Sequence, residues 1–264
     1  MIWTTRPRSD CAGLQAITAG DGPLVVLIHG VGLRAEAWAA QIDALARSHR
    51  VVAPDLPGHG SSPLPGPGAD LGAYGDRVAA AIAACASGGP ALLVGHSLGA
   101  MIALDLAIRF PHLSAGVAAL NAVYRRRDAA TAAVRARAAM LDGVAVPDPA
   151  PTLDRWFADD PSPERAACEA WLRAVDPVGY KMAYGVFAAQ DGPSEAGLRA
   201  LHGPALFMTG DTEPNSLPAM SRAMAAIAPQ GRAEICAGAA HMMPMTHPAA
   251  VNAALRALAT EVFA

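Results

Sequence analysis

Short apolar runs alternate with stretches of helical spacing along the first half of the chain. Such uninterrupted runs are typical of strands buried on both faces of a sheet, and they lie at residues 24–28, 51–54, 91–94 and 115–120. Between them, apolar residues recur at helical spacing around residues 38–45, 71–86 and 100–110. Because strand and helix alternate, we expect a mostly parallel, twisted sheet flanked by helices, with right-handed crossovers. The pattern therefore predicts an α/β domain.

The alternation stops between residues 122 and 197. Helical patterns take the place of buried strands there, at residues 128–141, 162–175 and 180–189. Alternation then resumes, with strands expected at 205–208 and 233–236 and helices at 217–227 and 248–263. An inserted helical cap explains the interruption. We therefore predict an α/β core of residues 1–121 and 198–264, carrying a cap of residues 122–197.

One strand runs directly into a helix through the sequence GHSLG at residues 95–99. Turning this corner in so few residues strains the backbone of the middle residue, and glycines two positions away avoid the resulting clashes. Ser97 is then exposed at the carboxyl end of a strand, where ligands bind in open α/β sheets. The context of strand and helix favours a nucleophile elbow over a simple Gly/Ser turn, with Ser97 as the nucleophile.

A serine nucleophile needs a base that takes its proton and an acid that orients the base. Among the eight histidines, only His241 lies in a loop after the last strand and downstream of an acid at a strand end. The acid is Glu213 or Asp211, which share the loop after the strand at residues 205–208. The chain order therefore predicts a triad of Ser97, His241 and one of these two carboxylates.

The reaction also needs N–H donors for the oxyanion. The N–H of Leu98 lies in the first turn of the helix that follows Ser97. A second strand end, with the sequence HGVG at residues 29–32, leaves N–H groups unshielded by side chains. We therefore nominate the N–H groups of Leu98 and Val31, with Gly30 as an alternative.

The composition bears on partners and location. The net charge of −3 gives no general attraction for nucleic acid or anionic membrane, so neutral or weakly anionic small molecules are the expected partners. The arginines at positions 125–127, 135 and 137 are interpreted as a solvated helix face. No apolar run has the length of a signal peptide or a membrane span, which predicts a cytoplasmic protein.

The four cysteines lie far apart at positions 11, 85, 168 and 236, without a C-x-x-C pair. This spacing favours free, mostly buried thiols over a zinc or redox site. His241 and His247 stand six residues apart with no acidic or cysteine cluster beside them. We therefore expect no metal.

Several motifs follow one another in a single order: His29-Gly30, Asp55 with Gly58 and Gly60, GHSLG at residues 95–99, the acid loop after Gly210, and His241. In this set and order the chain resembles the serine branch of the α/β-hydrolase superfamily over nearly its whole length. Within that superfamily, the sequences DLPGHG at residues 55–60 and RWF at 155–157 resemble 3-oxoadipate enol-lactonases and related small-molecule esterases.

This resemblance implies an α/β-hydrolase fold and a cofactor-free serine hydrolase. The expected substrate is a carboxylic ester or lactone of a small molecule, cleaved through an acyl-enzyme. In relatives a cap aromatic lines the substrate pocket, which makes Trp156 a candidate substrate contact. The family places its acid, usually an aspartate, three residues beyond the glycine that corresponds to Gly210. This position favours Glu213 over Asp211. Some relatives carry the acid after the preceding core strand, where this chain has Asn121.

Two other functions stay open at this point. One is hydrolysis of a C–C bond in a vinylogous diketone, which uses the same fold and much the same residues. The other is a weakly catalytic, ligand-binding member of the fold, against which the intact set of serine, histidine and acid argues. The sequence predicts neither the identity of the substrate nor the oligomeric state.

Overall fold

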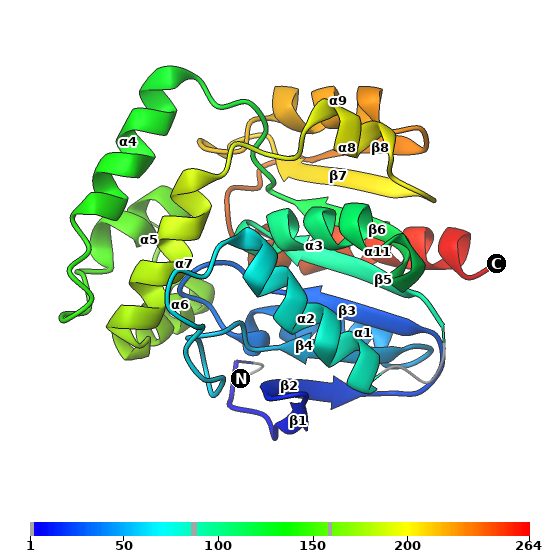
Figure 1. The fold of residues 1–264 in the computed structure, drawn as a ribbon, viewed down its shortest axis with the longest axis horizontal. Helices are drawn as coiled ribbons and strands as arrows, with labels where there is room; N and C mark the ends of the chain where they lie inside the picture. Colours follow the sequence, from blue (N-terminus) through cyan, green and yellow to red (C-terminus); the bar gives the residue numbers. More distant parts are fainter. Residues whose placement is uncertain (1–2, 86–88, 158–159) are drawn as a thin grey trace.

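The computed structural model describes residues 3–85, 89–157 and 160–264 (Figure 1). Eight strands form one sheet in the order β1-β2-β4-β3-β5-β6-β7-β8. They are β1 (Ser9–Cys11), β2 (Leu14–Ala19), β3 (Leu24–Ile28), β4 (Arg50–Pro54), β5 (Ala91–His96), β6 (Ser114–Leu120), β7 (Ala205–Gly210) and β8 (Gly231–Cys236). From β4 to β8 all neighbours pair in parallel, whereas β1 and β2 pair antiparallel. The predicted mostly parallel sheet is confirmed.

The central strands are buried on both faces. In β3, Val25 and Leu27 belong to one apolar core, while Val26 and Ile28 belong to the other. The first core also includes residues of α1 and α11, and the second includes residues of α2, α3 and α9, so the sheet has helices on both faces (Figure 1). A strand covered on both sides reads as a continuous apolar run, which explains why these strands could be predicted.

The helices around the sheet alternate with the strands. They are the 3-10 helix η1 (Ala35–Trp38), α1 (Ala39–Leu45), α2 (Leu71–Cys85), α3 (Leu98–Arg109), the 3-10 helix η2 (Pro111–Leu113), α8 (Glu195–Arg199), α9 (Pro218–Ile227), α10 (Met243–Thr246) and α11 (Pro248–Val262). Among the described helices, none is long and apolar enough to span a membrane.

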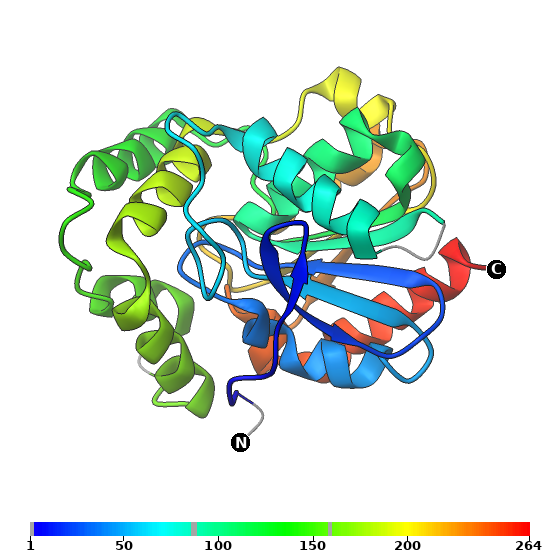
Figure 2. The ribbon, with the colours of Figure 1, turned by 60° about the horizontal axis from the view of Figure 1, so that its bottom comes forward.

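Four further helices lie between β6 and α8: α4 (Asp128–Ala139), α5 (Ala150–Phe157), α6 (Pro163–Ala174) and α7 (Pro177–Ala189). They stand together beyond the end of the sheet where the parallel strands finish, on the left in Figure 1, and Figure 2 shows them on the same side. Proline in the first turn and a side-chain cap start both α6 and α7, with Ser162 accepting from Arg165 N and Asp176 from Gly179 N. The sequence predicted three of these helices but not α5.

The α4–α7 segment contacts the rest of the molecule through bare backbone at the start of α7. A Cβ atom on Gly179 would lie 2.2 Å from the carbonyl oxygen of Gly58, and one on Gly58 would lie 2.6 Å from Gly179 Cα. Gly58 also has a φ of 77°, which side chains disfavour. Only glycine on both sides allows this close approach.

One prediction about the cysteines is wrong. Cys11 at the end of β1 and Cys85 at the end of α2 form a disulfide, with their Cα atoms 6.2 Å apart. The two lie 74 positions apart in the chain, and only the packing of α2 against β1 brings them together. Cys168 and Cys236 are free and buried, as expected.

Candidate active site

Ser97 occupies a strained turn between β5 and α3. Its φ of 57° and ψ of −118° lie in a region that side chains rarely adopt. A Cβ atom on Gly95 would lie 2.0 Å from the Gly99 carbonyl oxygen, and one on Gly99 would lie 2.0 Å from the Ile28 carbonyl oxygen. The two glycines of the motif therefore permit the turn and the close packing of α3 on β3, as a nucleophile elbow requires.

His241 and Glu213 form a buried pair. Nδ1 of His241 donates to Oε2 of Glu213 at 2.9 Å, and Oε1 of Glu213 accepts from the N–H groups of Asn215 and Ser216. Burial by itself raises the pKa of Glu213, but His241 and the two N–H donors outweigh it and hold that pKa below its ordinary value. The carboxylate is thus ionised, and it directs the Nδ1 proton of His241 toward itself.

Asp211, the other candidate acid, points elsewhere. Its Oδ1 accepts from the N–H of Gly238 at 2.7 Å, and the residue is exposed. Of the two carboxylates that the sequence left in one loop, the structure therefore brings Glu213 to His241.

The backbone of His241 is held by two buried donors. Its carbonyl oxygen accepts from Nε2 of His96 at 2.7 Å and from Nδ2 of Asn121 at 2.6 Å. Burial and the nearby His241 lower the pKa of His96 to about 3, so His96 is neutral with its proton on Nε2. Asn121, at the position where some relatives carry an acid, here fixes the loop of the histidine.

Two other rings lie close to the imidazole of His241. The centroid of His96 is 4.9 Å away, and Trp156 of α5 stacks at 5.4 Å with an interplanar angle of 22°. Trp156 therefore touches the ring of His241 in addition to lining the cavity described below.

The turn after β3 carries Val31 and is fixed by two other histidines. Nε2 of His59 accepts from the N–H of Gly32, and Nε2 of His29 accepts from the N–H of Leu56. Burial lowers the pKa of His59 to about 3 and also lowers the pKa of His29, so both stay neutral acceptors. The N–H groups of Val31 and Leu98 donate to no other residue that the structure describes, which leaves both available to an oxyanion.

A buried network of ion pairs lies next to this turn. Arg8 reaches Glu36 at 2.7 Å and Asp55 at 2.9 Å, and Oδ1 of Asp55 accepts from the N–H of Ala35. Glu36 and Asp55 are almost fully buried. Sequence reasoning missed Arg8 and Glu36, because a short polar segment gives no indication of a partner 28 residues away.

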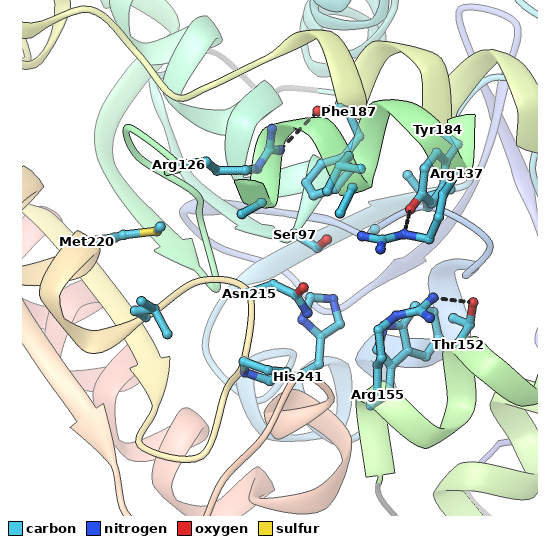
Figure 3. Close-up of a pocket in the computed structure, with 18 of the residues that line it drawn as sticks. Ser97, Arg126, Arg137, Thr152, Arg155, Tyr184, Phe187, Asn215, Met220 and His241 are labelled. Carbon is cyan, nitrogen blue, oxygen red and sulfur yellow. Dashed lines mark hydrogen bonds between the residues drawn. The ribbon is translucent and has the colours of Figure 1, made fainter. Parts of the chain in front are cut away.

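A cavity of about 230 Å³ joins these groups beneath α4–α7 (Figure 3). Gly30, Val31, Ser97, Trp156 and His241 all line it. The remaining walls are mainly aromatic and aliphatic, as is typical of a small-molecule pocket.

Four arginines also line the cavity: Arg126, Arg127, Arg137 and Arg155. The interpretation of residues 125–127, 135 and 137 as a solvated face was therefore wrong for Arg126, which is buried, and for Arg137, which is half-buried, whereas Arg127 lines the cavity but is exposed. Arg125 and Arg135 are exposed, as that interpretation expected.

The sequence profile of the alpha/beta hydrolase family matches residues 25–254. The chain belongs to the alpha/beta hydrolase family. It is an enzyme of this hydrolase type, and its sheet and flanking helices form the alpha/beta hydrolase fold that the motifs predicted. Among the described residues of this hydrolase, no group of three or more His, Cys, Asp or Glu could hold a metal ion.

Relatives of this hydrolase match almost end to end. It is 37% identical to (E)-2-((N-methylformamido)methylene)succinate hydrolase of Acinetobacter baylyi over 97% of this chain and 98% of that one. A structure of a thermophilic esterase from Thermogutta terrifontis with malate bound has a TM-score of 0.85 at 26% identity, covering 97% and 99% of the two chains. The enol-lactonase from Burkholderia xenovorans LB400 has a TM-score of 0.84 at 22% identity, covering 97% and 100%, and shows the fold alone.

Proposed function

We propose that this hydrolase cleaves a carboxylic ester or lactone of a small molecule through an acyl-enzyme. The observation that carries the proposal is one cavity lined by both Ser97 and His241, with Nδ1 of His241 bonded to the buried Glu213. Because Nδ1 carries the proton, Nε2 is the basic nitrogen, as the base of a serine triad requires.

The reaction follows from these positions. Ser97 Oγ attacks the acyl carbon while its proton passes to Nε2 of His241, and the N–H groups of Val31 and Leu98 stabilise the resulting oxyanion. The bond to the leaving group then breaks as His241 returns the proton to the leaving oxygen, and the acyl group stays on Ser97. A water molecule, deprotonated by His241, attacks this ester in turn and releases the acid.

A second candidate is hydrolysis of an N-acyl enamine. It is favoured by the relative that matches nearly the full chain, since the name of its substrate describes a vinylogous N-formyl enamine on a succinate. A second relative, 34% identical over 39% of this chain, is named 2-(acetamidomethylene)succinate hydrolase. Such an enamine and the diketone considered in the sequence analysis are both vinylogous substrates. Ser97, His241 and the N–H groups of Val31 and Leu98 would serve the hydrolysis of either one.

The proposal includes a cap role for residues 122–197. More than half of the residues that line the cavity come from this stretch, whereas Ser97, His241 and Glu213 come from the segments before and after it. We propose that the cap selects the substrate, with Trp156 as one contact. The cytoplasmic location stays a prediction.

Replacing the nucleophile tests the proposal. Ser97→Ala should keep the fold, by circular dichroism, while lowering kcat for 4-nitrophenyl acetate by about 10⁴ to 10⁶, because a triad acts as a unit. A fluorophosphonate should label wild type stoichiometrically at Ser97 and leave the variant unlabelled. Activity of Ser97→Ala within about tenfold of wild type would refute the assignment. Parallel assays on lactones, short-chain esters and N-acyl enamines then decide which bond is cleaved.

A further inference from the structure

Two arginines of the cavity have no carboxylate partner among the residues that the structure describes. Nε of Arg137, on α4, donates to the hydroxyl of Tyr184 at 3.0 Å, and Nη2 of Arg155, on α5, donates to the hydroxyl of Thr152 at 2.9 Å. Both side chains are half-buried. A hydroxyl orients a guanidinium but does not neutralise it, so each retains a positive charge with unused N–H donors.

The surroundings make this arrangement unfavourable without an anion. Burial and the neighbouring positive charge of Arg137 both lower the pKa of Arg155 from its ordinary value. Among the described residues that line the cavity, none is acidic. Two like charges held beside one partly buried space attract a negative ligand to it.

The other two arginines of the cavity are placed differently. Arg126 is buried, and its guanidinium donates to the carbonyl oxygens of Phe187 and Gln190 while stacking over the Phe187 ring. Its donors are therefore already engaged by the protein. Arg127 is exposed, so water competes for any ligand there. Arg137 and Arg155 are thus the two best placed to bind an anion inside the cavity, and Figure 3 shows them together on one side of it.

Their position defines which end of a ligand they reach. A second hollow of about 300 Å³ shares Arg137, Thr152, Arg155, Tyr180 and Tyr184 with the cavity, but neither Ser97 nor His241 lines it. The two arginines therefore stand where the cavity meets this second hollow, which neither Ser97 nor His241 lines.

We infer that Arg137 and Arg155 bind a carboxylate at the end of the substrate opposite to the bond that Ser97 attacks. The substrate class is then a small dicarboxylic acid derivative in which one acyl group reacts and the second carboxylate stays free. Planar guanidinium groups suit a carboxylate because they can donate two parallel hydrogen bonds to it. This inference rests on the proposed function for the reacting end and adds the recognition of the other end.

Equilibrium binding tests the site without catalysis. Glutarate and its neutral diamide, glutaramide, are titrated calorimetrically into wild type and into Arg137→Gln, Arg155→Gln and Arg155→Lys. We expect glutarate to bind wild type more tightly than glutaramide, and each Gln variant to weaken glutarate by about tenfold to a hundredfold. The affinity of Arg155→Lys for glutarate should lie between those of wild type and Arg155→Gln, because lysine keeps the positive charge but cannot donate two parallel hydrogen bonds. Arg135→Gln is the matched control, because it removes the same charge from an exposed position on the same helix.

Kinetics then connect the site to turnover. The 4-nitrophenyl monoesters of succinic, glutaric and adipic acid are compared with the mixed 4-nitrophenyl methyl diesters of the same acids. The rate of spontaneous hydrolysis is subtracted in each case. Wild type should favour at least one monoester by kcat/KM, mainly through KM, and Arg137→Gln and Arg155→Gln should reduce that preference by about tenfold or more, because they lower kcat/KM for the monoester more than for the diester.

The two experiments separate the possible failures. Equal effects of Arg135→Gln and the two cavity variants, or no preference of wild type for the anionic member of each pair, would overturn the carboxylate site even if Ser97 is acylated. Tight glutarate binding that depends on Arg137 and Arg155, together with failure of Ser97 to react with a fluorophosphonate, would support the site and refute the proposed function instead.

Discussion

Glu213 and Asp211 stand two positions apart in one loop and make different hydrogen bonds. Glu213 is almost fully buried and accepts from His241 and two backbone N–H groups, while Asp211 is exposed and accepts from Gly238. The loop thus offers one carboxylate to the imidazole and uses the other to join the ends of β7 and β8.

Single substitutions at Glu213 and Asp211 distinguish the two roles. Glu213→Gln should lower kcat by about 10³ to 10⁴, because an amide does not hold the imidazolium and allows the wrong tautomer. Glu213→Asp should keep partial activity. Asp211→Asn should leave kcat almost unchanged, because the amide oxygen of asparagine can still accept from the N–H of Gly238. The measurement is kcat for one ester at saturation, and the reverse ranking would transfer the acid role to Asp211.

Single residues differed in how far the sequence could assign them. The sequence could bring Ser97 and His241 to one site, because strand, turn and chain order restrict where a candidate nucleophile and its candidate base lie, and both residues line the same cavity. Arg137 and Arg155 could not be assigned to the cavity, because α4 buries only Val134 and α5 only Leu153 and Phe157, and an arginine beside a cavity has the same periodicity as one beside water. Arg8 escaped notice for a related reason, since its partners Glu36 and Asp55 become neighbours only in the folded chain.

At the scale of elements, the buried strands were the easiest to predict and α5 the hardest. Strands β3, β5, β6 and β7 read as apolar runs because both of their faces are covered. Helix α5 spans only eight residues, has a proline at position 151 and buries only Leu153 and Phe157. Helix α5 packs against α6 and lines the cavity. Such tertiary contacts stabilise a short helix, and the local sequence does not reveal them.

Helix α5 nevertheless brings Trp156 to His241. Trp156→Ala should reorder the kcat/KM values of a panel of esters and lactones, because it removes an aromatic side chain that lines the cavity and stacks on the imidazole of His241. Labelling of Ser97 by a small phosphonate should change less. Trp171→Ala, in neighbouring α6, serves as a control because Trp171 does not line this cavity. An unchanged ranking would assign Trp156 to packing alone.

For the whole molecule, Glu36, which is buried beside Arg8, makes stability depend on acid pH. Burial raises the pKa of Glu36, but its bonds to Arg8 and the N–H of Arg6, with the charge of Arg34, outweigh this and set it at about 2. A carboxylate with a depressed folded pKa stabilises the protein above its unfolded pKa of about 4.5 and loses that contribution as the pH falls toward 2. The contribution is on the order of 3 kcal/mol.

Urea unfolding between pH 6 and pH 2.5 measures this dependence. Glu36→Gln should be less stable than wild type at pH 6, and the gap in unfolding free energy should narrow steadily below pH 4.5. Glu169→Gln removes a carboxylate that pairs with Arg173 on the surface, and it should differ from wild type by less than about 1 kcal/mol throughout. A constant gap for Glu36→Gln would show that Glu36 stabilises by packing rather than by its charge.

The chain draws most of the cavity wall from a single uninterrupted stretch, residues 126–187, whereas Ser97 lies before that stretch and both Glu213 and His241 lie after it. An exchange within this stretch alters the shape and charge of the pocket, while Ser97, Glu213 and His241 are encoded outside it. If the proposed cap role of this stretch holds, substrate preference is a separable trait in evolution, encoded in one continuous block that recombination can transfer whole. For protein engineering, the same block marks where a library should be placed to redirect the enzyme without rebuilding its chemistry.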